Sequence, residues 1–150
     1  MRLSDFLEPD RVSLDLRAGR RDEAISEMID LLGLDERARA AVARLIEKRE
    51  QAGSTGIGRG IAIPHCRSLA LSRLRLAFGR SVPGVDFGAE DQRLVHGIFL
   101  IVAPPIEVSN QYLSVLAKIA QFAKEPDTLD RILRLDSVDG FFDLLTSKGI

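Results

Sequence analysis

Apolar residues recur along the chain with two different periods, and each period predicts a type of element. Within residues 22–32, four apolar side chains from Ile25 to Leu32 lie at i, i+3, i+4 and i+7, which places them on one face of a helix. Residues 97–103 are uniformly apolar, as in a central strand that is covered on both faces. The same reasoning predicts further helices over 35–51 and around 113–120, 129–133 and 138–145, and further strands at 12–16, 61–63 and 74–82.

Short polar side chains mark several of the predicted helix starts, because their oxygen atoms can accept hydrogen bonds from the N–H groups of the first turn. Asp35 precedes the second helix, and Ser109 or Asn110 precedes the third. Asp127 and Ser137 precede the two helices near the C-terminus. Four glycines within eight residues end the second helix, because glycine loses much backbone entropy in a helix.

Helices and strands alternate along the 150 residues, without an internal repeat or a linker. This alternation is typical of the α/β class. A chain of this length fits one domain and can bury a substantial core. We therefore expect a single domain over residues 1–150, with a mixed β-sheet of about five strands sandwiched by helices.

The composition argues against several classes of function. The 21 basic and 22 acidic residues leave a formal charge of -1, so no basic surface for nucleic acid is indicated. The longest apolar stretch, residues 97–105, is far shorter than the ~20 residues that span a bilayer, and the N-terminus lacks the apolar core of a signal peptide. The single cysteine, Cys66, cannot form an internal disulfide. We expect a cytoplasmic protein that neither inserts into membranes nor binds nucleic acid.

The most unusual segment is GSTGIGRGIAIPHC, residues 53–66. Its glycine density suggests a phosphate-binding loop, but a P-loop requires Lys followed by Ser or Thr where this chain has Arg59 and Gly60. The spacing of Gly56, Gly58 and Gly60 also differs from G-x-G-x-x-G. Both nucleotide motifs lead from a strand into a helix, whereas here a helix leads into a strand. Nucleotide binding is therefore not predicted.

His65 is the candidate catalytic residue of this segment. It ends a short predicted strand directly after Pro64, and proline restricts both its own φ and the residue before it, which makes the strand end stiff. A neutral imidazole has a lone pair on one nitrogen, so it can attack a phosphoryl group without a metal or a separate base. Phosphoryl transfer also needs donors for the phosphoryl oxygens. The glycine-loop N–H groups, Ser54, Thr55 and Arg49 are the candidate donors.

Spacing alone leaves two other interpretations of His65 open. A histidine beside a strand is often a hydrogen-bonded structural residue, and His65, Cys66 and His96 are all potential metal ligands. Neighbours on a strand point to opposite faces, however, so His65 and Cys66 would not converge on one ion. His96 precedes the apolar central strand, where we expect it to be exposed. We expect no metal and no cofactor.

The run from Arg49 to His65, R-E-Q-A-G-S-T-G-I-G-R-G-I-A-I-P-H, resembles the active-site signature of the mannitol/fructose-type IIA components of the bacterial phosphotransferase system. The nitrogen-regulatory IIA proteins belong to that group. The resemblance continues through VPGVDFGAEDQRLVHGIFLIVAP, YLSVLAKIA and FFDLLT. It implies a phosphotransferase in which His65 accepts a phosphoryl group on Nε2 from HPr or its nitrogen-branch relative. It also implies that Arg49 lies near the phosphohistidine and that Thr55 lies in the loop beside it.

The chain departs from this family pattern at one position. Members commonly have a second active-site histidine where this sequence has Tyr112, in Y-L-S-V-L. A tyrosine hydroxyl can donate a hydrogen bond to a phosphoryl oxygen, but it stays neutral near pH 7. An imidazolium gives a charge-assisted bond that is about twice as strong. Tyr112 is therefore either a phosphate-stabilising donor of a weaker kind or a packing residue.

Three functions are open at this point. A regulatory IIA protein controls target proteins through the charge at His65. A sugar-specific IIA subunit passes the phosphoryl group to a IIB domain. A non-phosphorylated interaction module keeps the fold but not the transfer, which Tyr112 makes conceivable. The 150 residues contain no fused IIB, membrane or HPr segment, which favours the regulatory interpretation.

Overall fold

A long antiparallel pair of strands, β5 (Arg75–Val85) and β6 (Val95–Ala103), forms the centre of the protein. The computed structural model describes residues 2–106 and 110–150. Shorter strands join the central pair in the order β1-β5-β6-β3-β2, and β4 also pairs with β6. These shorter strands are β1 (Val12–Ser13), β2 (Gly56–Gly58), β3 (Ile61–Ala62) and β4 (His65–Arg67).

The sheet is mixed, as predicted. β1 is parallel to β5, β3 and β4 are parallel to β6, and β2 is antiparallel to β3. It has six strands among the described residues, where about five were expected. One reason is that the strand predicted at 61–63 ends before Pro64, which has no N–H group to donate to a neighbouring strand. The carbonyl oxygen of Pro64 still accepts a hydrogen bond from the N–H of Ile101, at 3.0 Å.

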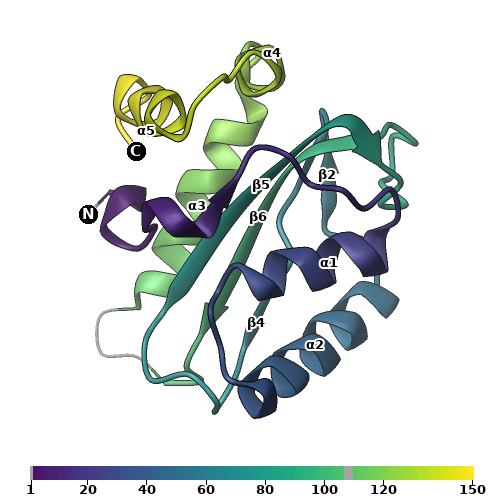
Figure 1. Ribbon diagram of the computed structural model, residues 1–150, viewed down its shortest axis with the longest axis vertical. Coiled ribbons are helices and arrows are strands. Elements are labelled where there is room, and N and C mark those ends of the chain that lie inside the picture. Colours follow the sequence, from purple (N-terminus) through teal and green to yellow (C-terminus); the bar gives the residue numbers. More distant parts are fainter. Residues whose placement is uncertain (1, 107–109) are drawn as a thin grey trace.

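Helices cover both faces of the sheet, and this confirms the predicted α/β sandwich (Figure 1). On one face lie α1 (Arg21–Asp30) and α2 (Glu36–Gln51). On the other face lie α3 (Gln111–Lys124), α4 (Thr128–Leu133) and α5 (Val138–Ser147), with the short 3-10 helices η1 (Leu3–Asp5) and η2 (Pro9–Arg11) near the N-terminus. None of the helices in the described parts of the chain is long and apolar enough to cross a bilayer.

Each face of the sheet has its own apolar core, because successive residues of a strand point to opposite faces. Phe99 and Ile101 of β6 belong to the core that also contains Phe141 of α5. Leu100 and Val102 belong to the core under α1 and α2. All four β6 side chains are fully buried, which confirms the prediction that this apolar run is a central strand.

Two of the predicted helix caps are confirmed. Asp35 and Ser137 each accept a hydrogen bond from the backbone N–H three residues later, at 2.8 and 3.0 Å. The prediction for Asp127 is wrong, because its side chain makes no capping bond although it directly precedes α4. Its carboxylate instead lies 2.8 Å from Nζ of Lys148, and this hydrogen bond holds the pKa of Asp127 below its usual value.

The start of α3 differs from the expected capped geometry. Asn110 precedes the helix with a left-handed backbone, at φ 53°, and its side chain makes no capping bond. Ser109, the other predicted cap, lies outside the described residues.

Candidate functional site

His65 opens strand β4, which runs parallel to the end of β6. It stands opposite Ile101 in the register, and its side chain is half-buried. The expectation that His65 ends a strand is therefore wrong, because Pro64 separates β3 from β4 and His65 begins the second of them. The backbone at His65 is still rigid, because β4 is hydrogen-bonded to the central strand and a proline precedes it.

The imidazole of His65 is oriented by the backbone of its own segment. Nδ1 lies 2.7 Å from the carbonyl oxygen of Ile63. A carbonyl oxygen can only accept a hydrogen bond, so this contact requires a proton on Nδ1. In the neutral ring the lone pair is then on Nε2. The backbone thus selects the tautomer in which Nε2 is the nucleophilic atom.

His65 lines a cavity of about 360 Å³ that lies between the end of α2, the loop after it and α3. The other polar members of the lining are Arg49, Ser54 and Thr55, which are three of the four predicted phosphate-stabilising residues. The remaining members are apolar and comprise Ile57, Ile63, Leu116, Ala117 and Ala120. The cavity therefore combines one imidazole and one guanidinium with apolar walls.

Arg49 lies in the last turn of α2 and is exposed. Its Nη1 donates a hydrogen bond to the carbonyl oxygen of Gly53 at 2.8 Å, which anchors the side chain to the loop that follows the helix. A guanidinium presents several N–H groups in a planar fork that matches the oxygens of a phosphoryl group. Arg49 is therefore a donor with suitable chemistry in the same cavity as His65.

The hydroxyl groups of Ser54 and Thr55 are used within the loop. Oγ of Ser54 donates to the carbonyl oxygen of Phe87 at 3.0 Å and accepts from the N–H of Gly56 at 2.9 Å. The hydroxyl of Thr55 donates to the carboxylate of Glu50, and the backbone N–H of Thr55 donates to the same carboxylate at 3.2 Å. Both hydroxyl hydrogens are thus engaged with the protein, and these two residues hold the shape of the loop.

Glu50 is a residue of this site that the sequence analysis missed. Its side chain is only 4% exposed, which is unusual for a carboxylate. Burial of a charge is costly unless the charge is hydrogen-bonded, and here both carboxylate oxygens accept from Thr55. The sequence signal was weak, because an acidic residue after Arg49 looks no different from the exposed Glu47 of the same helix.

Tyr112 lies beside His65 but is not part of the cavity lining. Its ring centroid lies 6.2 Å from that of His65, with the two planes tilted by 58°, and the residue is 7% exposed. The guanidinium of Arg67 lies over the face of the same ring, with Cζ 4.3 Å from the ring centroid. Arg67 is a second neighbour of the site that the sequence analysis missed.

The other two candidate metal ligands lie apart from this site. Cys66 belongs to the core under α1 and α2, on the opposite face of β4, and burial raises the pKa of its thiol to about 12. His96 is half-buried in β6, and its Nδ1 lies 2.8 Å from the carbonyl oxygen of Ser81. Within the described ranges, no three His, Cys, Asp or Glu side chains come together in a way that could hold a metal ion.

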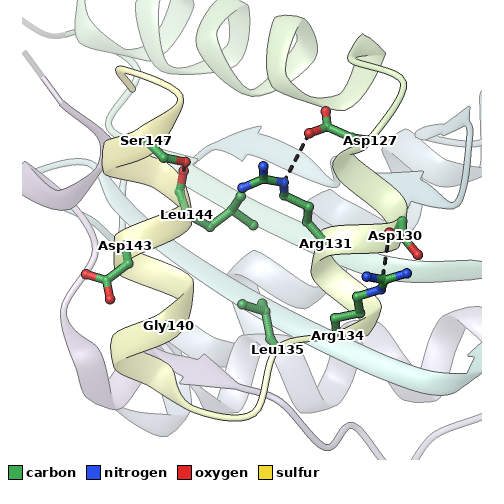
Figure 2. A pocket seen from close by; sticks show the side chains of 9 residues that line it. All are labelled: Asp127, Asp130, Arg131, Arg134, Leu135, Gly140, Asp143, Leu144 and Ser147. Atoms are coloured by element: carbon green, nitrogen blue, oxygen red, sulfur yellow. Dashed lines mark hydrogen bonds and ion pairs between the residues drawn. The ribbon is translucent and has the colours of Figure 1, made fainter.

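A larger cavity of about 690 Å³ lies between α4 and α5, away from His65 (Figure 2). Its arginines are paired with carboxylates of the same helix region, Arg131 with Asp127 at 3.1 Å and Arg134 with Asp130 at 3.2 Å. It contains no histidine or cysteine. Although this cavity is larger, it has no histidine that could carry a phosphoryl group, so it is not the candidate site.

The chain is similar to one group of proteins along nearly its whole length. Residues 5–148 match the family model described as phosphoenolpyruvate-dependent sugar phosphotransferase system, EIIA 2. The chain is 31% identical over 138 residues to a fructose-specific EIIA component of Haloferax volcanii, which covers 89% of this chain and 88% of the relative. It is 27% identical over 149 residues to a nitrogen regulatory protein of Bradyrhizobium diazoefficiens, which covers 97% of this chain and 95% of the relative.

One relative is a much longer protein than this chain. The chain is 29% identical over 147 residues to a fructose-specific EIIABC component of Bacillus subtilis, and it spans 23% of the length of that protein. Among solved structures, the nitrogen regulatory protein IIA-Ntr of Neisseria meningitidis superposes with a TM-score of 0.86 at 27% identity, over 95% of this chain and 98% of that one.

Proposed function

The chain belongs to the EIIA 2 family of the phosphoenolpyruvate-dependent sugar phosphotransferase system, and we propose that it carries a phosphoryl group on Nε2 of His65. The observation that supports this most strongly is the 2.7 Å contact between Nδ1 and the carbonyl oxygen of Ile63. It leaves the lone pair on Nε2, in a residue that shares a cavity with Arg49. This transfer needs two components, a nucleophile and a cationic group that donates hydrogen bonds to the phosphoryl oxygens.

In the proposed reaction, Nε2 attacks the phosphorus atom of a phosphohistidine on the donor protein. The bond between Nε2 and phosphorus forms while the donor's nitrogen–phosphorus bond breaks, and the electron pair of that bond returns to the donor nitrogen. The proton on Nδ1 stays in its hydrogen bond with Ile63. In transfer to an acceptor, a nucleophile of the acceptor attacks phosphorus while the bond between Nε2 and phosphorus breaks, and the electron pair of that bond returns to Nε2.

Arg49 is the proposed direct ligand of the phosphoryl oxygens. The hydroxyls of Ser54 and Thr55, and the N–H groups of Thr55 and Gly56, are engaged within the loop. We therefore assign Ser54 and Thr55 a supporting role, in which they keep the loop in place beside His65. Tyr112 packs beside the imidazole.

The proposed donor is a phosphocarrier of the HPr type, or its nitrogen-branch relative. The walls around His65 include the exposed Ile57, at 48% exposure, and Leu116 and Ala120 of α3. An apolar surface with a few charged groups suits a small and transient contact between proteins, since the partner must leave after transfer. With such a partner, we propose a cytoplasmic location for the protein.

We propose a regulatory role for the phosphorylated and unphosphorylated forms, with a target protein that distinguishes them by the charge at His65. The nitrogen regulatory protein of Bradyrhizobium diazoefficiens is matched over 95% of its length, and the IIA-Ntr structure superposes with a TM-score of 0.86. The alternative is a fructose-type subunit that passes its phosphoryl group to a IIB domain, since the relative of Haloferax volcanii is 31% identical. Transfer to a purified fructose-type IIB domain within seconds would favour this alternative.

Incubation with phosphoenolpyruvate, enzyme I and HPr, followed by measurement of the intact mass, tests the phosphocarrier proposal. We expect one phosphoryl adduct that is stable in base and labile in acid, as for a phosphoramidate, and no adduct in the variant His65→Ala. An adduct that survives acid points instead to a serine, threonine or tyrosine. The absence of any adduct on the intact protein would support the non-phosphorylated interaction module.

A further inference from the structure

Arg67 and His65 lie on the same face of the protein. They are two residues apart on β4, where both side chains are half-buried and Cys66 between them is turned into the opposite core. Tyr112 of α3 packs against both of them, with its ring centroid 6.2 Å from that of His65 and 4.3 Å from Cζ of Arg67. Three side chains from two elements thus form a continuous row beside the cavity.

We infer that Arg67, held over the ring of Tyr112, is a second cationic residue of the His65 site, which stabilises the phosphorylated form through its charge. This inference rests on the proposed function, because it requires a phosphoryl group at His65. Arg67 does not line the cavity, so it acts on the phosphoryl group only through its charge. Arg49 remains the proposed direct ligand of the phosphoryl oxygens.

Several contacts hold the guanidinium in position. Its Cζ lies over the aromatic ring, 4.3 Å from the centroid, as in a cation–π pair. Its Nη1 also donates to the carbonyl oxygen of Pro104 at 2.9 Å, just after the end of β6. A side chain held in this way loses little further entropy when the phosphoryl group arrives, so its charge is pre-organised.

The charge acts over a short and poorly screened path. A phosphoryl group on His65 carries close to two negative charges near pH 7. The buried ring of Tyr112 packs next to both His65 and Arg67, and Coulomb interactions in such a region are stronger than in water. An arginine side chain is always cationic in proteins, so its charge is present whenever His65 is phosphorylated.

The same contacts also allow a purely structural role, in which Arg67 only fastens the chain at Pro104. Two substitutions separate the roles. Arg67→Gln keeps a donor for the carbonyl oxygen but removes the charge, whereas Arg67→Lys keeps the charge. Arg37→Gln is the matched control, because Arg37 is exposed in the first turn of α2 and the substitution removes the same charge.

The test uses potassium phosphoramidate, a small phosphoryl donor that needs no docking surface, and follows the adduct by intact mass and ³¹P NMR at low salt. We expect Arg67→Gln to slow phosphorylation by roughly 5- to 20-fold, and Arg67→Lys and Arg37→Gln to stay within about 2-fold of the wild type.

A further substitution, Tyr112→Leu, removes the ring on which the guanidinium lies and leaves Arg67 itself unchanged. We expect it to slow phosphorylation in the same direction and to reduce the additional effect of Arg67→Gln in the double variant. This variant keeps the inference testable if Arg67→Gln does not fold.

Equal rates for the wild type and Arg67→Gln would overturn the inference and leave the phosphocarrier function intact. So would a loss in Arg67→Lys as large as that in Arg67→Gln, accompanied by a lower melting temperature, because the role would then be structural. If the wild type accepts no phosphoryl group from phosphoramidate or from HPr, the proposed function itself fails and the inference fails with it.

Discussion

Nδ1 of His65 lies 2.7 Å from the carbonyl oxygen of Ile63, two residues earlier in the same chain. The two residues flank Pro64, so the ring is oriented by the backbone at the point where β3 ends and β4 begins. The hydrogen bond places the proton on Nδ1, and the reactive lone pair is therefore on the other nitrogen. This one contact therefore determines both the orientation of the ring and which of its nitrogens can react.

Removal of the positive charge of Arg49 should impair phosphorylation more than stability. The side chain is exposed, so we expect Arg49→Gln to change the free energy of unfolding by less than about 0.5 kcal/mol. The loss of a charged donor at the phosphoryl group should slow phosphorylation by HPr by roughly 10- to 100-fold. Stopped-flow mixing with phosphorylated HPr measures the rate, and urea titration measures the free energy of unfolding. A rate equal to that of the wild type would contradict the assignment of Arg49.

The buried pair of Glu50 and Thr55 should matter for both stability and transfer. Glu50→Gln leaves one amide oxygen in place of a carboxylate that accepts two hydrogen bonds from Thr55, so we expect a loss of about 1–3 kcal/mol in the free energy of unfolding. The released loop should also slow phosphorylation of His65. Glu47→Gln, an exposed substitution in the same helix, serves as the control. If both variants unfold at the same urea concentration, the loop does not depend on this pair.

The thiol of Cys66 should be unreactive in the folded protein. Burial raises its pKa from 9.0 to about 12, so at pH 8 it is almost entirely protonated. We expect slow reaction with Ellman's reagent at this pH and rapid reaction after unfolding in urea. Fast modification of the folded protein would show that the thiol is accessible.

The same pKa shift predicts how stability changes in base. The folded pKa lies above the unfolded value, so the contribution of Cys66 is fully present below pH 9 and is lost as the pH rises from 9 towards 12. The slope is at most about 1.4 kcal/mol per pH unit. The difference in unfolding free energy between the wild type and Cys66→Ala, followed from pH 8 to 10.5, isolates this effect. A difference that does not change with pH contradicts it.

The substitution Tyr112→His should make phosphorylation depend on pH. A histidine there becomes cationic as the pH falls through about 6.5 and can give a charge-assisted bond to the phosphoryl group. We expect the phosphorylated fraction at equilibrium with HPr to rise by roughly 3- to 10-fold between pH 8 and pH 6, relative to the wild type. Identical pH profiles for the two proteins would show that the ring at this position does not contact the phosphoryl group.

The fold could largely be predicted from periodicity, because the central strands and the helices on both faces have strong and different patterns of apolar residues. The break at Pro64 could not be located, since a strand pattern does not show which residue loses its partner. Strand β2 was also missed, because glycines at 56 and 58 favour a loop by propensity and pair with β3 only through the tertiary structure. Asp127 failed as a cap because Lys148, twenty-one residues later, competes for its carboxylate.

The candidate site shows the same division. His65 and Arg49 could be selected because their residue types suit the chemistry. The sequence also indicates that His65 follows a rigid proline and that Arg49 lies near the end of a helix. Glu50 and Arg67 could not be selected, because each is ordinary in the sequence and acquires its place through a contact with Thr55 or Tyr112. Ser54 and Thr55 were selected for their hydroxyl groups, yet those groups hold the loop.

The most direct test of the account is to identify the phosphorylated atom. The protein is labelled with ¹⁵N in its histidines, phosphorylated with phosphoenolpyruvate, enzyme I and HPr, and examined by long-range proton–nitrogen NMR. We predict a single phosphoryl group on Nε2 of His65, with Nδ1 still protonated and His96 unchanged. A phosphoryl group on Nδ1, on another residue or on no residue would contradict the account.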